Sequence, residues 1–198
     1  MNKTDCILIG GGIMSITLAK LLHELDPNIN IKIYEKLSSC ALESSQSINN
    51  AGTGHAGFCE LNYTPLSKNH VVNIDKAIRI NREFEVSLEF WSFLTKKYKS
   101  FKPKSFITQV PHISFVKGEK NISFLKKRYE ALSKNSLFKD MQFSRNKETI
   151  KEWAPLIAED LKDDIAMTRI NYGSDVDFES LSHQMLKIYR QIKSFQFM

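Results

Sequence analysis

The first residues of the chain alternate between apolar and polar stretches in the order strand, helix, strand. The apolar run Cys6–Ile9 predicts a buried strand, which stops at three consecutive glycines. Apolar residues then recur three and four positions apart, as on one face of a helix: Met14, Leu18, Leu21 and Leu25. Asp26-Pro27-Asn28 breaks this helix, and the alternation over Ile31–Tyr34 predicts a second strand.

The remainder of the chain changes its periodicity several times. Behind a capping residue, Asp75, residues 77–98 carry apolar side chains at helical spacing, which predicts one long packing helix. A basic, proline-containing stretch over 96–104 marks a boundary, and alternation over 105–109 and 112–116 predicts two paired strands around Pro111. Further patterns predict a helix over 122–132, a strand over 141–144, a short helix over 148–153, a strand over 165–172 and a helix over 178–192.

Composition and charge exclude several classes of protein. With 198 residues and 42% hydrophobic content, the chain can form one large core or two small ones. The net charge of +6 comes from scattered lysines, so we expect no nucleic acid partner, although weak attraction to an anionic membrane surface is compatible with it. Three cysteines, an odd count without metal-ligand spacing, indicate a reducing compartment and no disulfide framework. No metal site is expected, and Cys6 is expected in the core. No apolar run approaches the ~20 residues that cross a bilayer, and no cleavage site follows the N-terminus, so we expect neither an exported nor an integral membrane protein.

The first glycine turn carries candidate chemistry. Gly10 and Gly12 precede Ser15 in the spacing Gly-x-Gly-x-x-Ser, between a predicted strand and a predicted helix. In dinucleotide-binding folds such glycines let a pyrophosphate approach the helix N-terminus, and a carboxylate about 20 residues further on binds ribose hydroxyls. Glu35 ends the second strand, where that carboxylate is expected, although an ordinary charge at a strand end is the alternative. We therefore predict an adenine dinucleotide site that includes Gly10, Gly11, Gly12, Ser15 and Glu35.

A second glycine-rich segment follows at 49–57. Its three closely spaced glycines exclude a comfortable helix or central strand and indicate close backbone approach to a ligand. Paired asparagines, a histidine and an aromatic-proline turn accompany the glycines, so we favour a ligand-facing loop over a flexible surface loop.

In combination, these segments resemble the malate:quinone oxidoreductase family. Three motifs are similar to that family's FAD-domain signatures: Ile9-Gly-Gly-Gly-Ile-Met-Ser15, Asn49-Asn-Ala-Gly-Thr-Gly-His55 and Glu60-Leu-Asn-Tyr-Thr-Pro65. Later motifs match in the same order: Ser105-Phe-Ile107, Val110-Pro-His-Ile-Ser-Phe-Val116, Phe124-Leu125, Arg128-Tyr129 and Lys151-Glu-Trp-Ala-Pro-Leu156. The resemblance runs from about residue 5 to residue 192, and Asp177 stands where asparagine is expected, a mild change for a helix cap.

The resemblance implies an α/β fold in which a Rossmann-like FAD-binding domain is interrupted by a β-rich α+β substrate domain. It places residues 1–100 in the first segment of the FAD-binding domain and 101–172 in a partial substrate domain. Residues 173–198 then hold a helix that returns to the FAD-binding domain and leads into its next strand. Because members of the family are considerably longer, the chain looks truncated. We accordingly expect the apolar face of the last helix, and one edge of the sheet, to lack strands that lie beyond Met198.

The implied reaction is FAD-dependent oxidation of L-malate to oxaloacetate, with electrons passed to a membrane quinone. It implies FAD as cofactor and a cytoplasmic protein bound peripherally to the inner face of the cytoplasmic membrane. The resemblance adds further cofactor-binding residues: Asn50, Ala51, Gly52, Thr53 and Gly54. It makes His55 the best candidate catalytic residue facing the flavin, with a buried histidine bonded to the backbone as the alternative. Four arginines are available for the carboxylates of malate: Arg79, Arg82, Arg128 and Arg169.

Two other interpretations remain open from the sequence. A flavin oxidoreductase of the same fold could oxidise another 2-hydroxy acid or an amino acid. The chain could also be an inactive truncated fragment.

Overall fold

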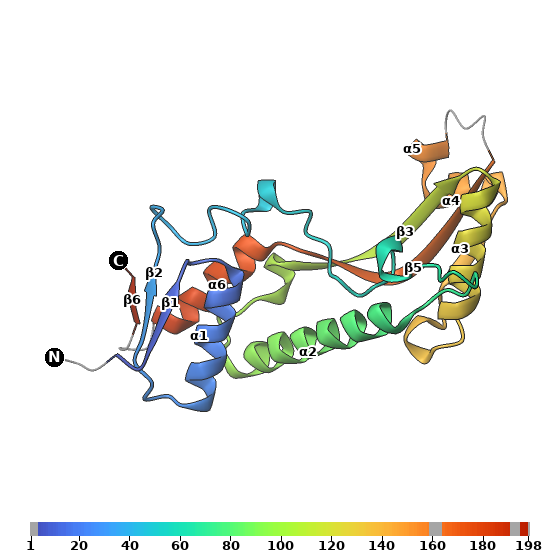
Figure 1. Ribbon diagram of the computed structural model, residues 1–198. Coiled ribbons are helices and arrows are strands. Elements are labelled where there is room, and N and C mark those ends of the chain that lie inside the picture. Colours follow the sequence, from blue (N-terminus) through green and yellow to red (C-terminus); the bar gives the residue numbers. More distant parts are fainter. Residues whose placement is uncertain (1–3, 159–163, 191–194, 198) are drawn as a thin grey trace. The chain divides into compact units, whose positions relative to one another are not determined.

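The computed structural model describes residues 4–158, 164–190 and 195–197 (Figure 1). The chain divides into two compact units. The first comprises residues 1–53, 89–108 and 175–198, and the second comprises 54–88 and 109–174. Residues 54–88 therefore fold with the second unit, although the sequence pattern placed them before the boundary at 96–104. Helix α2 (Asp75–Lys97) runs from one unit into the other.

The first unit is built on a small parallel sheet. Strands β1 (Cys6–Ile9) and β2 (Ile31–Tyr34) pair in the register Cys6↔Ile31 and have the predicted bounds. Strand β6 (Phe195–Phe197) adds to β2, so the order is β1-β2-β6 and β1 is an edge strand. Since parallel strands need a crossover, helix α1 (Ile13–Leu25) connects β1 to β2 and helix α6 (Phe178–Arg190) precedes β6. The last helix thus leads into a strand of the first unit.

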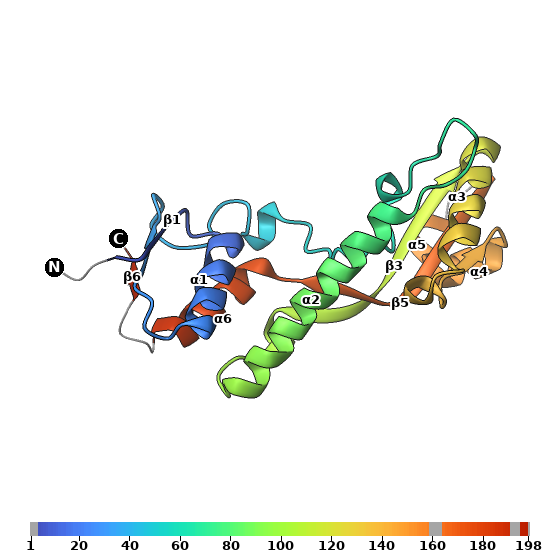
Figure 2. The ribbon, with the colours of Figure 1, turned by 60° about the horizontal axis from the view of Figure 1, so that its bottom comes forward.

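Helix α1 buries a different face from the one that its apolar spacing indicated. Four of its apolar residues are exposed: Met14, Leu18, Leu21 and Leu25. The buried face instead contains Ile16, Ala19, Lys20 and His23. Helix α6 lies alongside α1 in both views (Figure 2), and the His23 and Tyr189 rings meet edge to face at 5.4 Å. The helix was therefore predicted correctly, but its buried side was not.

Two further expectations about this unit are corrected. Ile7 and Ile9 on β1 are 56% and 78% exposed, so β1 is not the buried strand that its composition predicted. The apolar face of α6 was expected to stay exposed without strands that lie beyond Met198. Leu181, Met185 and Ile188 are nevertheless buried within the described residues. The apolar surface left exposed in this unit includes β1 and α1, because α6 already packs against the opposite face of α1.

The second unit contains a sheet of order β3-β5-β4, formed by β3 (Ile107–Lys117), β4 (Gln142–Ser144) and β5 (Ile165–Val176). Strand β4 is antiparallel to β5, with Phe143 opposite Thr168. The expected hairpin around Pro111 is wrong, since Pro111 lies inside the single strand β3. Proline lacks an amide donor, and the edge position of β3 tolerates that loss.

Three helices complete this unit: α3 (Glu119–Leu132), α4 (Lys147–Trp153) and α5 (Pro155–Ala158). Short 3₁₀ helices occupy Leu61–Tyr63 and Ser136–Phe138 in this unit, and Ser47–Asn49 and Pro103–Ser105 in the first unit. The central core of the second unit joins Phe58, Ala77, Leu132, Phe138 and Ile170. Within the parts of the chain that the structure describes, no helix combines the length and apolarity that a bilayer crossing requires.

A buried charge cluster ties α1 to the end of α2. The Glu24 carboxylate accepts hydrogen bonds from Lys97 Nζ at 2.5 Å and Tyr98 Oη at 2.7 Å, and it also pairs with the wholly buried Lys20. Burial by itself would raise the pKa of Glu24, but the bonds from Lys20, Lys97 and Tyr98 outweigh it and lower the pKa from 4.5 to about 2.

This cluster predicts acid sensitivity of the first unit. A carboxyl whose pKa falls on folding stabilises the protein above its unfolded pKa and loses that contribution as pH falls from 4.5 towards 2. Between pH 6 and pH 3, Glu24 should account for a loss of roughly 2 kcal/mol in the free energy of unfolding. Urea unfolding of wild type and Glu24→Gln at both pH values measures it. The variant should lose less stability on acidification, and an equal loss in both proteins would contradict the assignment.

Candidate functional site

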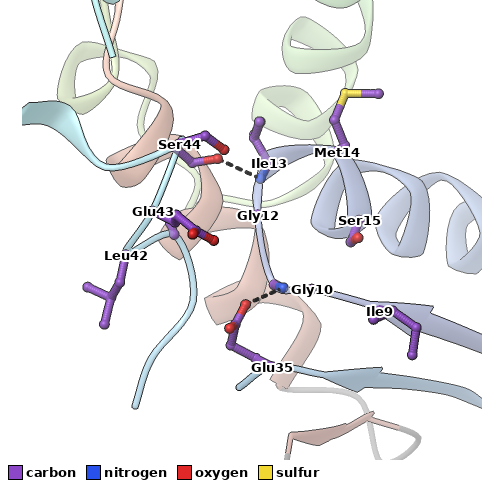
Figure 3. Close-up of a pocket in the computed structure, with 13 residues that line it drawn as sticks. Ile9, Gly10, Gly12, Ile13, Met14, Ser15, Glu35, Leu42, Glu43 and Ser44 are labelled. Atoms are coloured by element: carbon purple, nitrogen blue, oxygen red, sulfur yellow. Dashed lines mark hydrogen bonds between the residues drawn. The ribbon is translucent and has the colours of Figure 1, made fainter. Parts of the chain in front are cut away.

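A pocket of about 230 Å³ opens at the first glycine turn (Figure 3). The turn and the first residues of α1 form one wall, and Glu35 at the end of β2 lines it as well. The segment 41–45 completes the lining. The pocket therefore brings together five of the predicted cofactor residues: Gly10, Gly11, Gly12, Ser15 and Glu35.

The backbone of the turn explains two of its glycines. Gly10 has φ +88°, a left-handed conformation that side chains disfavour, and its amide donates to Tyr34 O at 2.7 Å. Gly12 has an ordinary extended conformation, with φ −81° and ψ 176°, and immediately precedes α1. An α-helix leaves its first amides without partners in the helix, so this wall offers N–H donors and the positive end of the helix dipole. The turn can therefore bind an anion.

Glu35 is held over this turn by backbone donors. Its Oε1 accepts the Leu37 amide at 2.9 Å, and its Oε2 accepts the Gly11 amide at 2.6 Å (Figure 3). The bonds from Leu37 and Gly11 lower the pKa of this carboxyl, so it is charged at neutral pH. Each carboxylate oxygen can still accept another hydrogen bond, because it carries two lone pairs. Glu35 is therefore placed and charged to bind hydroxyl groups in the pocket.

Sequence reasoning missed the segment 41–45. Ser45 is buried, and its Oγ accepts the Ile13 amide at 3.0 Å, which caps the start of α1. Ala41 has φ +60° and donates its amide to Gly11 O at 3.1 Å. The serine-rich composition of this region was the only signal of a helix cap, and nothing in the sequence marks an alanine for a left-handed conformation.

The residues of the pocket fit the pyrophosphate and ribose of a dinucleotide. A Cβ on Gly12 would extend to 3.3 Å from Ser45 Oγ, so glycine keeps the space in front of the helix N-terminus open. Amide donors at the start of α1 can bind a negative group there, and the charged carboxylate of Glu35 can accept hydrogen bonds from sugar hydroxyls.

The second glycine-rich segment contributes no residue to the lining of this pocket. Asn50 connects to it through Nδ2, which donates to Ser44 O at 3.0 Å, while its Oδ1 accepts the Gly52 amide at 2.9 Å. Ala51 is exposed, Gly52 leaves no room for a Cβ beside Asp175, and Thr53 forms a bridge with Asp175. The Gly54 amide donates to Ser174 O at 2.7 Å. Glycines 52 and 54 are thus explained by close packing against the end of β5.

His55 is accessible. Its side chain is 57% exposed, and its Nδ1 lies 3.3 Å from Glu60 Oε1. The alternative of a buried histidine bonded to the backbone is therefore wrong.

The four candidate arginines lie in different environments. Arg79 and Arg82 line an open groove on α2, where Arg79 Nε lies 3.9 Å from Glu83. Arg169 is partly buried over the Trp153 ring, with 5.8 Å from its Cζ to the ring centroid. Arg128 is wholly buried, and its Nε and Nη2 atoms donate to Thr64 and to backbone carbonyls. Arg128 is therefore the least accessible of the four candidates.

Known proteins match nearly the whole length of this chain. The family described as "Malate:quinone oxidoreductase (Mqo)" matches residues 2–198. A probable malate:quinone oxidoreductase of Hahella chejuensis is 48% identical over 198 residues, which cover 99% of this chain and 40% of that protein. Another, from Geobacillus sp. (strain WCH70), is 53% identical over 186 residues, covering 93% of this chain and 36% of that protein. The chain therefore spans about two fifths of the length of these relatives.

Solved structures share the fold at low sequence identity. L-proline dehydrogenase from P. horikoshii matches with a TM-score of 0.63 at 18% identity, covering 99% of this chain and 44% of that one. L-α-glycerophosphate oxidase from Mycoplasma pneumoniae, solved with FAD bound, matches with a TM-score of 0.62 at 16% identity, covering 100% and 45%. On the strength of the match over residues 2–198, the chain belongs to the malate:quinone oxidoreductase family.

Proposed function

We propose that this chain supplies the FAD-binding part of an enzyme that oxidises L-malate to oxaloacetate and passes the electrons to a membrane quinone. The observation that carries the proposal is the pocket in which the glycine turn, the start of α1 and the Glu35 carboxylate converge. Relatives about 50% identical carry the name malate:quinone oxidoreductase, which favours malate over other hydroxy acids and amino acids as substrate.

The residues of the pocket have separate roles in this proposal. The amides at the start of α1 bind the pyrophosphate of FAD, Gly10 allows the tight turn, and Gly12 keeps the approach to these amides open. Glu35 accepts hydrogen bonds from the ribose hydroxyls of the adenosine half. Bound FAD supplies the acceptor for the two electrons that malate loses.

The second glycine-rich loop is proposed to face the flavin ring. Backbone atoms of five residues contact the ring in this proposal: Asn50, Ala51, Gly52, Thr53 and Gly54. His55 follows them at the surface. With Nδ1 turned towards Glu60, the Nε2 atom of His55 is the one placed to take the hydroxyl proton of malate. Arg79 and Arg82 are the accessible candidates for the malate carboxylates.

A membrane quinone requires the enzyme to reach a membrane surface. We therefore propose peripheral attachment to the cytoplasmic face of the inner membrane, to which the net charge of +6 contributes. Such attraction is salt-sensitive, because surface charges are screened over ~8 Å at physiological ionic strength.

Titration of the chain with FAD tests the cofactor site. Glu35→Ala should weaken FAD binding by about 1.5–3 kcal/mol, or roughly 10- to 100-fold, because charge-assisted hydrogen bonds to ribose are lost. Glu35→Gln should lie between wild type and Glu35→Ala, since the amide oxygen still accepts hydrogen bonds. Quenching of flavin fluorescence measures the affinity for FAD. Glu130→Ala, at an exposed position of α3, is the control for loss of a carboxylate.

Competition in the same titration locates the bound half of FAD. ADP should displace FAD, whereas FMN should not, because the pocket is assigned to the pyrophosphate and adenosine half. Unchanged FAD affinity in Glu35→Ala, or displacement by FMN but not by ADP, would refute the nucleotide assignment.

A further inference from the structure

Four consecutive carbonyls, those of residues 56–59 where the second glycine-rich segment ends, are each bound by a polar side chain. Asn81 Nδ2 donates to Ala56 O at 2.8 Å, and Ser114 Oγ donates to Cys59 O at 2.7 Å. Between them, Arg128 Nη2 donates to Phe58 O at 2.9 Å and to Gly57 O at 3.3 Å. Asn81, Ser114 and Arg128 come from α2, β3 and α3, so three separate elements hold one short piece of backbone.

Arg128 contributes most to this arrangement. Its side chain is 0% exposed, and its Nε also donates to Thr64 Oγ1 at 3.0 Å, at the end of the same segment. Burial lowers the pKa of Arg128 to about 10, which leaves the guanidinium charged at neutral pH. Among the described residues, the ion pairs that the structure contains do not include Arg128. The buried charge is therefore stabilised by the hydroxyl of Thr64 and by backbone carbonyls, which it holds in return.

Residues 54–60 depend on these side-chain hydrogen bonds because they form no helix or strand of their own. Residues 50–60 lie outside every helix and strand, and Gly57 has φ +70°, with no room for a Cβ beside Ala77 O. The Gly54 amide fixes the other end on Ser174 O. His55 therefore lies between the anchored amide of Gly54 and the carbonyls bound by Asn81 and Arg128.

We propose that Arg128 is a positioning residue for the flavin-facing loop: through the carbonyls of Gly57 and Phe58 it holds Gly54 and His55 in the conformation that FAD meets. This inference rests on the proposed function. Because the loop is already held before FAD binds, binding loses less conformational entropy and the affinity for FAD is higher. Lysine cannot replace this arginine, because an ammonium group lacks the planar fork that reaches Thr64 and two carbonyls together.

Hydrogen exchange of the full 198-residue chain tests the loop without any ligand. In Arg128→Lys, amides of residues 54–64 should exchange at least ~10-fold faster, whereas those of β1 and α1 should keep their wild-type rates. Lys127→Met removes the neighbouring exposed cation from the same helix and should exchange as wild type does. Ser114→Ala removes one of the donors to this segment and provides a milder variant in case Arg128→Lys fails to fold.

FAD titration of the same variants tests the functional link. Arg128→Lys should bind FAD several-fold more weakly and shift the absorption bands of the bound flavin, whereas Lys127→Met should do neither. Wild-type exchange rates over residues 54–64 in folded Arg128→Lys and Ser114→Ala would overturn the inference that these side chains hold the loop. Faster exchange with unchanged FAD affinity and unchanged flavin bands would overturn the positioning role. A wild-type chain that binds no FAD would overturn the proposed function and the flavin part of this inference, while the exchange rates would still decide whether Arg128 holds the loop.

Discussion

The 198-residue chain by itself should show no malate-dependent reduction of a quinone analogue. It spans about two fifths of relatives such as those from Hahella chejuensis and Geobacillus, and the remaining flavin and substrate contacts are proposed to lie in the other three fifths. The first unit also exposes apolar surface on β1 and α1, where Ile9, Met14 and Leu25 are each at least 78% exposed. Parallel sheets normally have both faces covered, so this surface favours aggregation or partial unfolding of the isolated chain.

The measurement is expression of residues 1–198, flavin quantitation after purification and a malate-to-quinone-analogue assay. We expect little retained FAD and no turnover above background, with the full-length Geobacillus relative as the positive control for the assay. The local β1–turn–α1 unit should still bind added FAD weakly. Stoichiometric FAD together with clear malate-dependent reduction would show that these residues suffice and that this prediction is wrong.

Gly12→Val should abolish most FAD binding while leaving the first unit folded. The backbone at Gly12 has an extended conformation that any residue adopts, so valine introduces no conformational strain there. Its branched side chain would instead project towards Ser45 and fill the space in front of the helix N-terminus. Since each bond from an amide to a charged phosphate contributes about 1.5–3 kcal/mol, loss of two or more should lower affinity by more than ~100-fold.

Flavin fluorescence titration measures that loss, and urea unfolding checks the fold. Gly12→Ala should be intermediate, because its Cβ meets only Ser45 Oγ at 3.3 Å. Leu18→Val, on the exposed face of the same helix, controls for added β-branching and should bind as wild type does. A Gly12→Val protein with wild-type FAD affinity would show that the pyrophosphate does not bind at this turn.

The candidate site was partly predictable because its first half is local. The strand, glycine turn, helix and second strand occupy a short stretch of sequence, and their signals of periodicity and chain breaking depend on neighbouring residues alone. Glu35 could be placed from its position after β2, and it lines the pocket with Gly10, Gly11, Gly12 and Ser15. The segment 41–45 could not be assigned, because the cap made by Ser45 and the left-handed backbone of Ala41 carry no periodic signal.

Other features depended on contacts between distant segments. Pro111 suggested a break between two strands, but an edge position in the sheet accommodates it within β3. Arg128 was one of four arginines available for the malate carboxylates, and the fold places it against carbonyls some 70 positions earlier in the chain. A sequence pattern shows that an arginine is available, whereas only the fold decides which acceptors surround it.

The sequence by itself determined the bounds of β1 and β2, the helix between them and the dinucleotide-type turn, since backbone conformation there follows from nearby residues. The tertiary structure alone decided which side of α1 is buried. Met14 and Leu25 have the spacing of a core face, yet Lys20 is buried instead, because Glu24 and Tyr98 provide partners for its charge and α6 covers that side. Periodicity reports that a helix has an apolar face. Burial depends on which distant segments pack against it, and their charges and shapes are not encoded locally.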